Sequence, residues 1–158
     1  MPTRIERLPP GAADPGVGSP AYETCIEIRR KVFIDGQSVP VEIEFDGLDR
    51  ESEHFLAFDD NADDEMVSVA LGTARMRVVD GVAKAERVAV LEKARGSGIG
   101  RALMEAIEFH AQEKGLESIR LNAQLQAADF YQKLGYVAQG EVFIEAGIDH
   151  RTMTKHLA

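Results

Sequence analysis

The sequence lacks the features that mark several large classes of protein. Cys25 is the only cysteine among 158 residues, which excludes an internal disulfide and a zinc site built from several thiolates. No stretch approaches 18 consecutive apolar residues, so we expect no membrane-spanning helix and no membrane partner. Residues 1–11 contain no apolar core of a secretory signal. We therefore expect a cytoplasmic protein, and we expect no bound metal.

Basic residues are also scarce. The chain has 18 Lys and Arg against 27 Asp and Glu, which gives a net charge of −9. A protein that grips nucleic acid without regard to sequence needs a basic stripe, so we predict no nucleic-acid partner. Hydrophobic residues make up 44% of the chain and charged residues 28%, a soluble globular composition. The length fits a single domain over residues 1–158 with a core of its own.

The patterns along the chain predict a mixed α/β domain. We expect strands at residues 3–8, 54–58, 67–78, 83–91, 118–123, 136–144 and 150–156, and helices at residues 21–34, 98–114 and 125–134. Residues 9–20 are rich in Pro and Gly and predict a surface loop. Residues 59–65 predict a charged turn, and Asp80-Gly81 predicts a tight hairpin turn.

Two of the predicted helices have clear signals at their ends. The helix at 98–114 carries one apolar stripe at helical spacing, made of Ile99, Leu103, Met104, Ile107 and Ala111. Lys114 followed by Gly115 is a typical C-terminal stop. We expect Gly36 to end the helix at 21–34.

A glycine-rich loop precedes the helix at 98–114 and reads RGSGIG from Arg95 to Gly100. The glycine spacing does not fit a dinucleotide fingerprint, because Arg101 stands at the third glycine position. It does not fit a Walker A loop either, since no Lys follows Gly100. The first N–H groups of a helix and its dipole favour an anion, and Arg95 and Arg101 flank the loop. We predict a phosphate site, with a plain turn as the alternative.

The run from Val88 to Gly100 resembles the coenzyme A motif of the GNAT superfamily of N-acyltransferases. That motif joins a V-x-V strand end to [QR]-x-x-G-x-[GA] at a helix start, and Arg95, Gly98 and Gly100 match it. The run Ala127–Tyr136 resembles the second signature of the family, A-x-x-F-Y-x-K-x-G-[FY]. The stretches IRRKVFIDGQSVP, EFDGLD and FIEAGIDHRTMTK resemble the ElaA-like and YjcF-like bacterial branch.

The resemblance implies the fold and the place of the coenzyme. The fold would be a mixed, mostly antiparallel sheet of about six or seven strands with helices on both faces and a V-shaped gap between strands 83–91 and 118–123. Coenzyme A would lie in that gap with its pyrophosphate on the glycine loop. The implied coenzyme-binding residues are Val88, Ala89, Val90, Arg95, Gly96, Ser97, Gly98, Ile99, Gly100, Arg101 and Gln124. Gln124 stands where many members carry Asn.

The resemblance also implies the reaction. An enzyme of this kind transfers an acetyl group directly from acetyl-CoA to a primary amine of a small molecule. A protein or peptide amine is an alternative acceptor, and a non-catalytic acyl-CoA sensor with the same fold is an alternative of another class. A homodimer is one oligomeric state that is compatible with the sequence.

Two residues are candidates for the proton transfers of such a reaction. Tyr131 is the implied general acid, because a phenol keeps its proton at neutral pH and can donate it to the leaving thiolate. The alternative is that Tyr131 has a structural role, with its ring packed in the core. Glu86 is the candidate general base, because the period of a strand places it on the same face as Val88 and Val90. A structural ion pair of Glu86 is an equally good interpretation.

The acceptor site is less defined. Glu42, Glu44, Asp46 and Asp49 lie where this fold forms its acceptor cleft, and they would attract a cationic amine. A solvated charged loop is the alternative. His54 and His150 are further candidates for the acceptor site or the base. The alternatives are an exposed position for His54 and a structural role in the hairpin for His150.

Overall fold

One seven-stranded sheet organises the described part of the chain. The computed structural model describes residues 3–59 and 69–157, in which the strand order is β1-β2-β3-β4-β5-β7-β6. The strands are β1 Thr3–Leu8, β2 Glu53–Asp59, β3 Val69–Val79, β4 Val82–Val90, β5 Ser118–Gln124, β6 Val137–Glu145 and β7 Ile148–His156. The α-helices are α1 Pro20–Arg29, α2 Val41–Glu44, α3 Ile99–Glu113 and α4 Ala128–Lys133. Residues 60–65 of the predicted turn and residues 67 and 68 lie outside the described residues.

The strands pair antiparallel except at one place. Strands β4 and β5 run parallel and are connected through α3. Between β3 and β4, Asp80 and Gly81 have φ angles of 53° and 77°, as a two-residue hairpin turn requires, so the predicted hairpin is confirmed. Strand β7 returns to pair with β5, which leaves β6 at the edge of the sheet.

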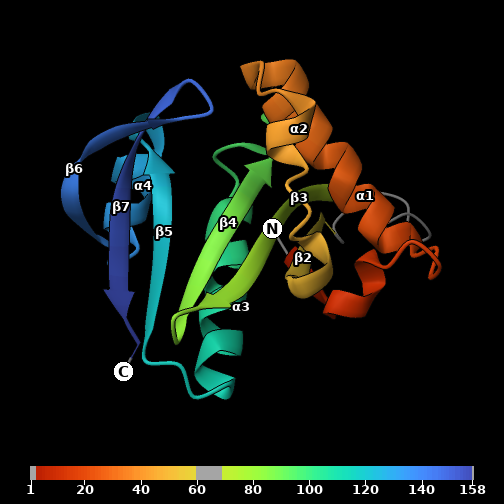
Figure 1. The fold of residues 1–158 in the computed structure, drawn as a ribbon, viewed down its shortest axis with the longest axis horizontal. Helices are drawn as coiled ribbons and strands as arrows, with labels where there is room; N and C mark the ends of the chain where they lie inside the picture. The colour runs from red at the N-terminus through yellow and green to blue at the C-terminus, as the bar shows by residue number, and fades with distance from the viewer. Residues whose placement is uncertain (1–2, 60–68, 158) are drawn as a thin grey trace.

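Helices cover both faces of the sheet. In Figure 1, α1 and α2 lie in front of β3 and β2, whereas α3 and α4 lie behind the sheet. The predicted apolar stripe of α3 is confirmed, since each of its five residues is at most 1% exposed. Burial of each of the four larger side chains contributes roughly 1.5–3 kcal/mol relative to an exposed position. A second cluster of buried residues, which includes Cys25 and Val32, joins α1 to the opposite face.

The helix predicted at 21–34 is present, but Gly36 does not end it. Helix α1 begins at Pro20, where the Ser19 hydroxyl accepts the N–H of Tyr22, and the chain continues as a π-helix over Arg30–Asp35. Gly36 keeps a helical φ of −83°. The chain leaves the helix at Ser38, whose φ is 58°. The position of Gln37 beside the sheet follows from this extra turn.

Two segments predicted as loops contain short helical turns. Residues 9–20 include a 3-10 helix at Pro10–Ala13, and Ala13 is buried. The irregular segment before β2 includes α2 and a second 3-10 turn at Asp49–Glu51. The remaining 3-10 turns are Glu92–Ala94 before α3 and Leu125–Ala127 before α4. The fold is therefore the mixed α/β arrangement that the sequence predicts, with helices on both faces.

Candidate active site

Strands β4 and β5 pair only at one end and then separate. Their parallel pairing covers Ala83–Ala85 and Ile119–Leu121 and stops there, and Figure 1 shows the two strands diverging towards the top of the view. A cleft of about 590 Å³ fills the space between and in front of them. Both strands and the segments around them line it, including Val88, Ala89, Val90, Leu121, Ala123, Gln124, Tyr131 and His150. The predicted V-shaped gap is confirmed.

A β-bulge at Arg87 changes which residues of β4 lie on the same face of the sheet. Arg87 has a φ of 55°, and the register between β3 and β4 shifts there. Residues on either side of a bulge no longer alternate in step. Val88 and Val90 pack against the core beneath α3, whereas Glu86 pairs with Arg75 on the α1 face. The expectation that Glu86 shares the face of Val88 and Val90 is therefore wrong.

Contacts of the Arg87 side chain keep the strained backbone of the bulge in place. A non-glycine residue in the left-handed region costs about 1–3 kcal/mol and persists where its surroundings enforce it. The Arg87 guanidinium donates to the carbonyl oxygens of Ile43 and Glu44 at 3.1–3.3 Å and contacts the Asp46 carboxylate at 3.2 Å. These contacts tie α2 to β4 at the point where the strand leaves β5.

The glycine loop sits at an uncapped helix start. Gly96 and Gly98 have φ angles of 83° and 91°, a backbone region that side chains disfavour. No side chain of the described residues caps α3. Its first backbone N–H groups therefore have neither an intrahelical acceptor nor a capping side chain. Gly100 serves packing as well, because a Cβ there would lie 3.1 Å from the Phe130 ring. The loop thus presents the geometry of an anion site.

The side chains around the loop have partners of their own. Arg95 lines the cleft, and its Nε donates to the Val90 carbonyl at 3.2 Å. The Ser97 hydroxyl donates to the carbonyl of Ala94. Arg101 lies along α3 and pairs with Glu105 at 2.9 Å on an exposed surface. Because both arginines keep exposed parts, they are free to reorient towards a phosphate.

Tyr131 belongs to the core and to the cleft at once. Its side chain is 7% exposed, and its ring makes edge contacts with Phe130 and Tyr136. It is also among the residues that line the cleft. Burial raises the pKa of the Tyr131 hydroxyl above its usual value, so the phenol keeps its proton. Packing of the Tyr131 ring in the core is therefore compatible with a role of its hydroxyl as a general acid.

Glu86 lies in an ion-pair network rather than in isolation. Its carboxylate accepts from Arg77 at 2.6 Å and from Arg75 at 3.0 Å, and Lys84 lies 3.4 Å away. Burial opposes ionisation, but the hydrogen bond from Arg77 and the charge of Arg75 outweigh it and lower the pKa of Glu86. A carboxylate held ionised in this way is a weak base. The geometry therefore favours the ion-pair interpretation of Glu86.

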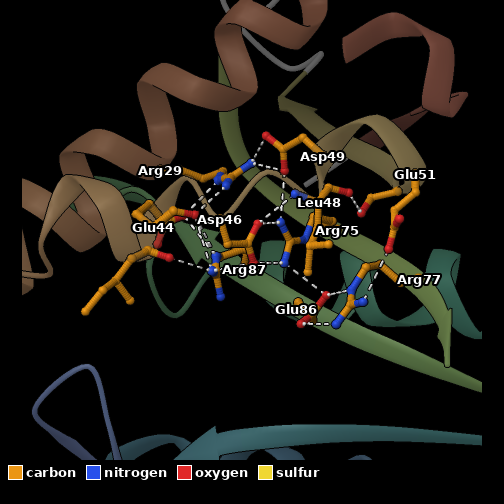
Figure 2. Close-up of polar contacts among 12 residues, drawn as sticks. Arg29, Glu44, Asp46, Leu48, Asp49, Glu51, Arg75, Arg77, Glu86 and Arg87 are labelled. Carbon is orange, nitrogen blue, oxygen red and sulfur yellow. Dashed lines mark hydrogen bonds and ion pairs between the residues drawn. The ribbon is translucent and has the colours of Figure 1, made fainter. Parts of the chain in front are cut away.

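The acidic stretch is neither a solvated loop nor a free negative surface. Figure 2 shows the carboxylates of Glu44, Asp46 and Asp49 beside arginines from α1, β3 and β4. Arg29 binds Glu44 and Asp49 at 2.8 Å, and Arg75 binds Asp46 at 2.9 Å. The side chains of these two arginines are 1% and 0% exposed. Glu42 stays exposed. Three of the four carboxylates are therefore paired with arginines, which weakens their attraction for a cationic amine, although Glu44 and Asp46 line the cleft.

The two histidine candidates occupy different environments. His54 is 1% exposed, lies under α1 with its Nε2 3.0 Å from the Asp49 carbonyl, and does not line the cleft. It is not exposed, and its position gives it no contact with an acceptor. His150 lines the cleft, and its Nδ1 donates to the Ile148 carbonyl at 2.7 Å. In the neutral form of this tautomer Nε2 is the acceptor nitrogen, and a Glu145 oxygen lies 3.8 Å from it.

Gln124 is tied across the cleft to Gln37, a residue to which the sequence assigned no role. Each amide donates to the other, at 2.8 and 3.1 Å, and Gln126 also donates to Gln124 at 2.9 Å. Both members of the pair line the cleft. The pair joins the segment after α1 to the end of β5. The only sequence signal for it was the place of Gln37 in the branch motif.

Residues 3–59 and 69–157 contain no cluster of metal-ligating side chains and no membrane-spanning helix. No group of three or more His, Cys, Asp or Glu side chains is arranged to hold a metal ion there. None of the helices in these ranges has the length and apolar character needed to cross a membrane.

The comparisons with known proteins agree with this geometry. A family model described as acetyltransferase (GNAT) domain matches residues 27–157. The chain therefore belongs to the GNAT acetyltransferase family and is an acyltransferase by class. YjcF of Bacillus subtilis, described as an uncharacterized N-acetyltransferase, is 40% identical over 129 residues, which cover 81% of this chain and 87% of YjcF.

More distant relatives and a solved structure extend the match. Protein ElaA of Escherichia coli is 27% identical over 147 residues, which cover 84% of this chain and 85% of ElaA. The crystal structure of an acyl-CoA N-acyltransferase from Pseudomonas aeruginosa superposes with a TM-score of 0.78 at 27% identity and covers 98% of this chain and 99% of that one. The chain thus lies in the branch of YjcF and ElaA, as the motifs indicated.

Proposed function

We propose that the protein transfers an acetyl group directly from acetyl-CoA to a primary amine of a small molecule. The observation that carries this proposal is the cleft, which runs along the diverging strands between Arg95, in the loop before α3, and the largely buried side chain of Tyr131. An extended thioester with an anionic end suits such a cleft. Acetyl as the acyl group, a cytoplasmic location and a homodimer are parts of this proposal.

The binding of the coenzyme follows from the backbone. The N–H groups between Gly96 and Arg101 bind the pyrophosphate at the helix start. The free edge of β4 at Val88–Val90, which no longer pairs with β5, offers hydrogen bonds to the pantetheine amides. A backbone N–H near Val90 polarises the thioester oxygen, where negative charge develops in the transition state.

Two proton transfers complete the reaction, and different residues carry them. Tyr131 donates its proton to the sulfur as the carbon–sulfur bond breaks. The amine loses a proton as it attacks, and we assign the base to His150 rather than Glu86. The hydrogen bond to Ile148 leaves Nε2 of His150 as an acceptor in the cleft, whereas the Glu86 carboxylate is occupied by arginines.

The test of the function is thiol release from acetyl-CoA, measured across a panel of small amines and peptides. Release that depends on a small amine, with the acetylated amine found by mass spectrometry, supports the proposal. Release that depends only on peptides would reassign the acceptor to a protein. Tight binding of acetyl-CoA with no acceptor-dependent release would instead identify a sensor.

The base assignment makes its own prediction. Replacing His150 by Gln is expected to lower the turnover number about 10²-fold or more, because the amine then lacks its proton acceptor. The affinity for coenzyme A, measured by calorimetry, should change little. His156 is exposed on the same strand, so His156→Gln is the matched control. Equal turnover in the two variants would remove His150 from the mechanism.

The glycine loop gives a prediction on binding. Gly98→Val is expected to raise the dissociation constant of coenzyme A at least tenfold, because the φ of 91° at Gly98 suits glycine and a side chain there displaces the N–H groups. Gly140 has a φ of 76° and open space around it on β6. Gly140→Val therefore carries similar strain away from the loop and should retain binding. Unchanged affinity in Gly98→Val would refute the pyrophosphate site.

A further inference from the structure

The hydrogen bonds of the sheet join its two halves at only one end of the cleft. Strands β4 and β5 pair over a few residues and then diverge. On β4, Val90 lies five residues beyond Ala85, the last paired residue, which is roughly 16 Å along a strand. On β5, Gln124 lies three residues beyond Leu121, which is roughly 10 Å. The sheet itself therefore does not fix the distance between the two strands at the open end of the cleft.

The groups of the proposed reaction lie at this open end and belong to different halves of the sheet. In that reaction the thioester lies along Val88–Val90 of β4, whereas Tyr131 and His150 come from α4 and β7. Gln124 is directly opposite His150 in the β5–β7 ladder, and α4 begins four residues after Gln124. The position of Gln124 relative to β4 therefore sets how far the His150 and Tyr131 side chains lie from the thioester.

Gln37 holds Gln124 from the α1 side of the cleft. The two amides donate to each other at 2.8 and 3.1 Å. The third hydrogen bond of the Gln124 amide comes from Gln126 at 2.9 Å, within the same half of the sheet. Between residues 20–50 and residues 118–157, the described structure contains no further hydrogen bond or ion pair. The Gln37–Gln124 pair is therefore the hydrogen-bonded connection between the two halves on this side.

The surrounding fold keeps Gln37 in place. The backbone N–H of Val39 donates to the Phe33 carbonyl at 2.9 Å, and the Val39 side chain is buried in the cluster that joins α1 to the sheet. Ala146 and Ile148, at the tip of the β6–β7 hairpin, pack against the same cluster from the other half. The half-buried amide of Gln37 is thus presented to Gln124 from a packed support.

We propose that Gln37 is a positioning residue, which acts through Gln124 to keep His150 and Tyr131 at reaction distance from the thioester on β4. The proposal rests on the function proposed above and deepens it. A misplacement of about 1 Å between reacting groups can lower a rate about 10²-fold, and reacting side chains need support to within about 0.5 Å. The amide pair supplies this support at the end of the cleft where β4 and β5 no longer pair.

The test compares Gln37→Met with the matched control Gln126→Met. Methionine is unbranched and of similar length, so each variant loses hydrogen bonds to Gln124 and keeps its packing. Only Gln37→Met cuts the connection across the cleft. The single-turnover rate constant of acetyl transfer, at saturating acetyl-CoA and amine, is expected to fall at least tenfold in Gln37→Met and to stay near that of the natural protein in Gln126→Met. The KM of the amine and the dissociation constant of coenzyme A should change little.

Two kinetic results would overturn the proposal and leave the acyltransfer intact. The first is an equal rate constant in the two variants. The second is a loss in Gln37→Met that appears only as weaker binding of the amine or of coenzyme A, because Gln37 would then contact a substrate rather than position the reacting groups. Thermal unfolding of both variants close to that of the natural protein is the check that the fold is retained.

Hydrogen exchange separates this proposal from the proposed function, because the measurement needs no reaction. The backbone amides of residues 145–150 are expected to exchange faster in Gln37→Met than in Gln126→Met, since the hairpin then opens more readily from the α1 side. That difference supports the connection even where no acceptor releases thiol and the proposed function fails. Equal exchange in the two variants would show that the amide pair does not hold the halves together, and it would overturn the proposal whether or not the protein turns over.

Discussion

Tyr131→Phe is expected to lower the turnover number by about 10²–10⁴-fold, the usual contribution of a general acid. The substitution removes only the hydroxyl, so the edge contacts of the ring with Phe130 and Tyr136 persist and the core should stay intact. Steady-state kinetics with acetyl-CoA and a reactive amine measure the loss. The dissociation constant of coenzyme A should change little, because the loop and the strand edge that we propose to bind it are untouched.

The control for this experiment is Tyr136→Phe. Tyr136 is buried against Tyr131, and its hydroxyl donates to Glu108 at 2.8 Å, outside the cleft lining. Loss of that hydrogen bond costs about 0.5–1.5 kcal/mol of stability and should leave turnover near that of the natural protein. If Tyr131→Phe kept full turnover, or if both variants lost it equally, Tyr131 would not be the acid.

Arg75→Ala is expected to destabilise the fold by about 3–5 kcal/mol, the range for removal of one partner from a buried ion pair. The Arg75 side chain is 0% exposed and contacts Asp46, Asp49 and Glu86 within 3.0 Å. Its loss removes one partner from Asp46 and from the largely buried carboxylates of Asp49 and Glu86. For a domain of this size each kcal/mol lowers Tm by about 2–4 °C, so thermal and urea unfolding both measure the effect.

A surface ion pair supplies the comparison for Arg75. Arg50 contacts Asp14 at 3.0 Å with both side chains well exposed, and such pairs contribute about 0–1 kcal/mol. Arg50→Ala should therefore unfold close to the natural protein. A Tm of Arg75→Ala equal to that of Arg50→Ala would show that the buried network does not hold α1 and α2 on the sheet.

Much of the fold could be predicted because the patterns that specify it are local. The apolar stripe of α3, the Asp80-Gly81 turn and the glycine loop are each contained within a few turns of chain. The gap between β4 and β5 was predicted from the family motifs, and the pairing ends where expected. The roles of individual polar residues were harder to predict, because each depends on which side chains the fold brings beside it.

The general base illustrates the limit. Strand periodicity placed Glu86 with Val88, but one bulge residue, Arg87, reversed the alternation. Nothing in the sequence around Arg87 indicates a bulge, because the contacts that hold its strained backbone come from the carbonyl oxygens of Ile43 and Glu44, more than 40 residues earlier. The acidic stretch likewise reads as a charged loop until Arg29 and Arg75 are placed against it.

The sequence by itself determined the family, the elements and the glycine loop at the start of α3, because short-range spacing and backbone preferences decide these. The tertiary structure alone decided which charges are free. It paired Glu44, Asp46 and Asp49 with buried arginines, and it left Glu42 exposed. Electrostatic interactions act through space between residues distant in sequence, so the character of the acceptor site emerges only in the folded chain.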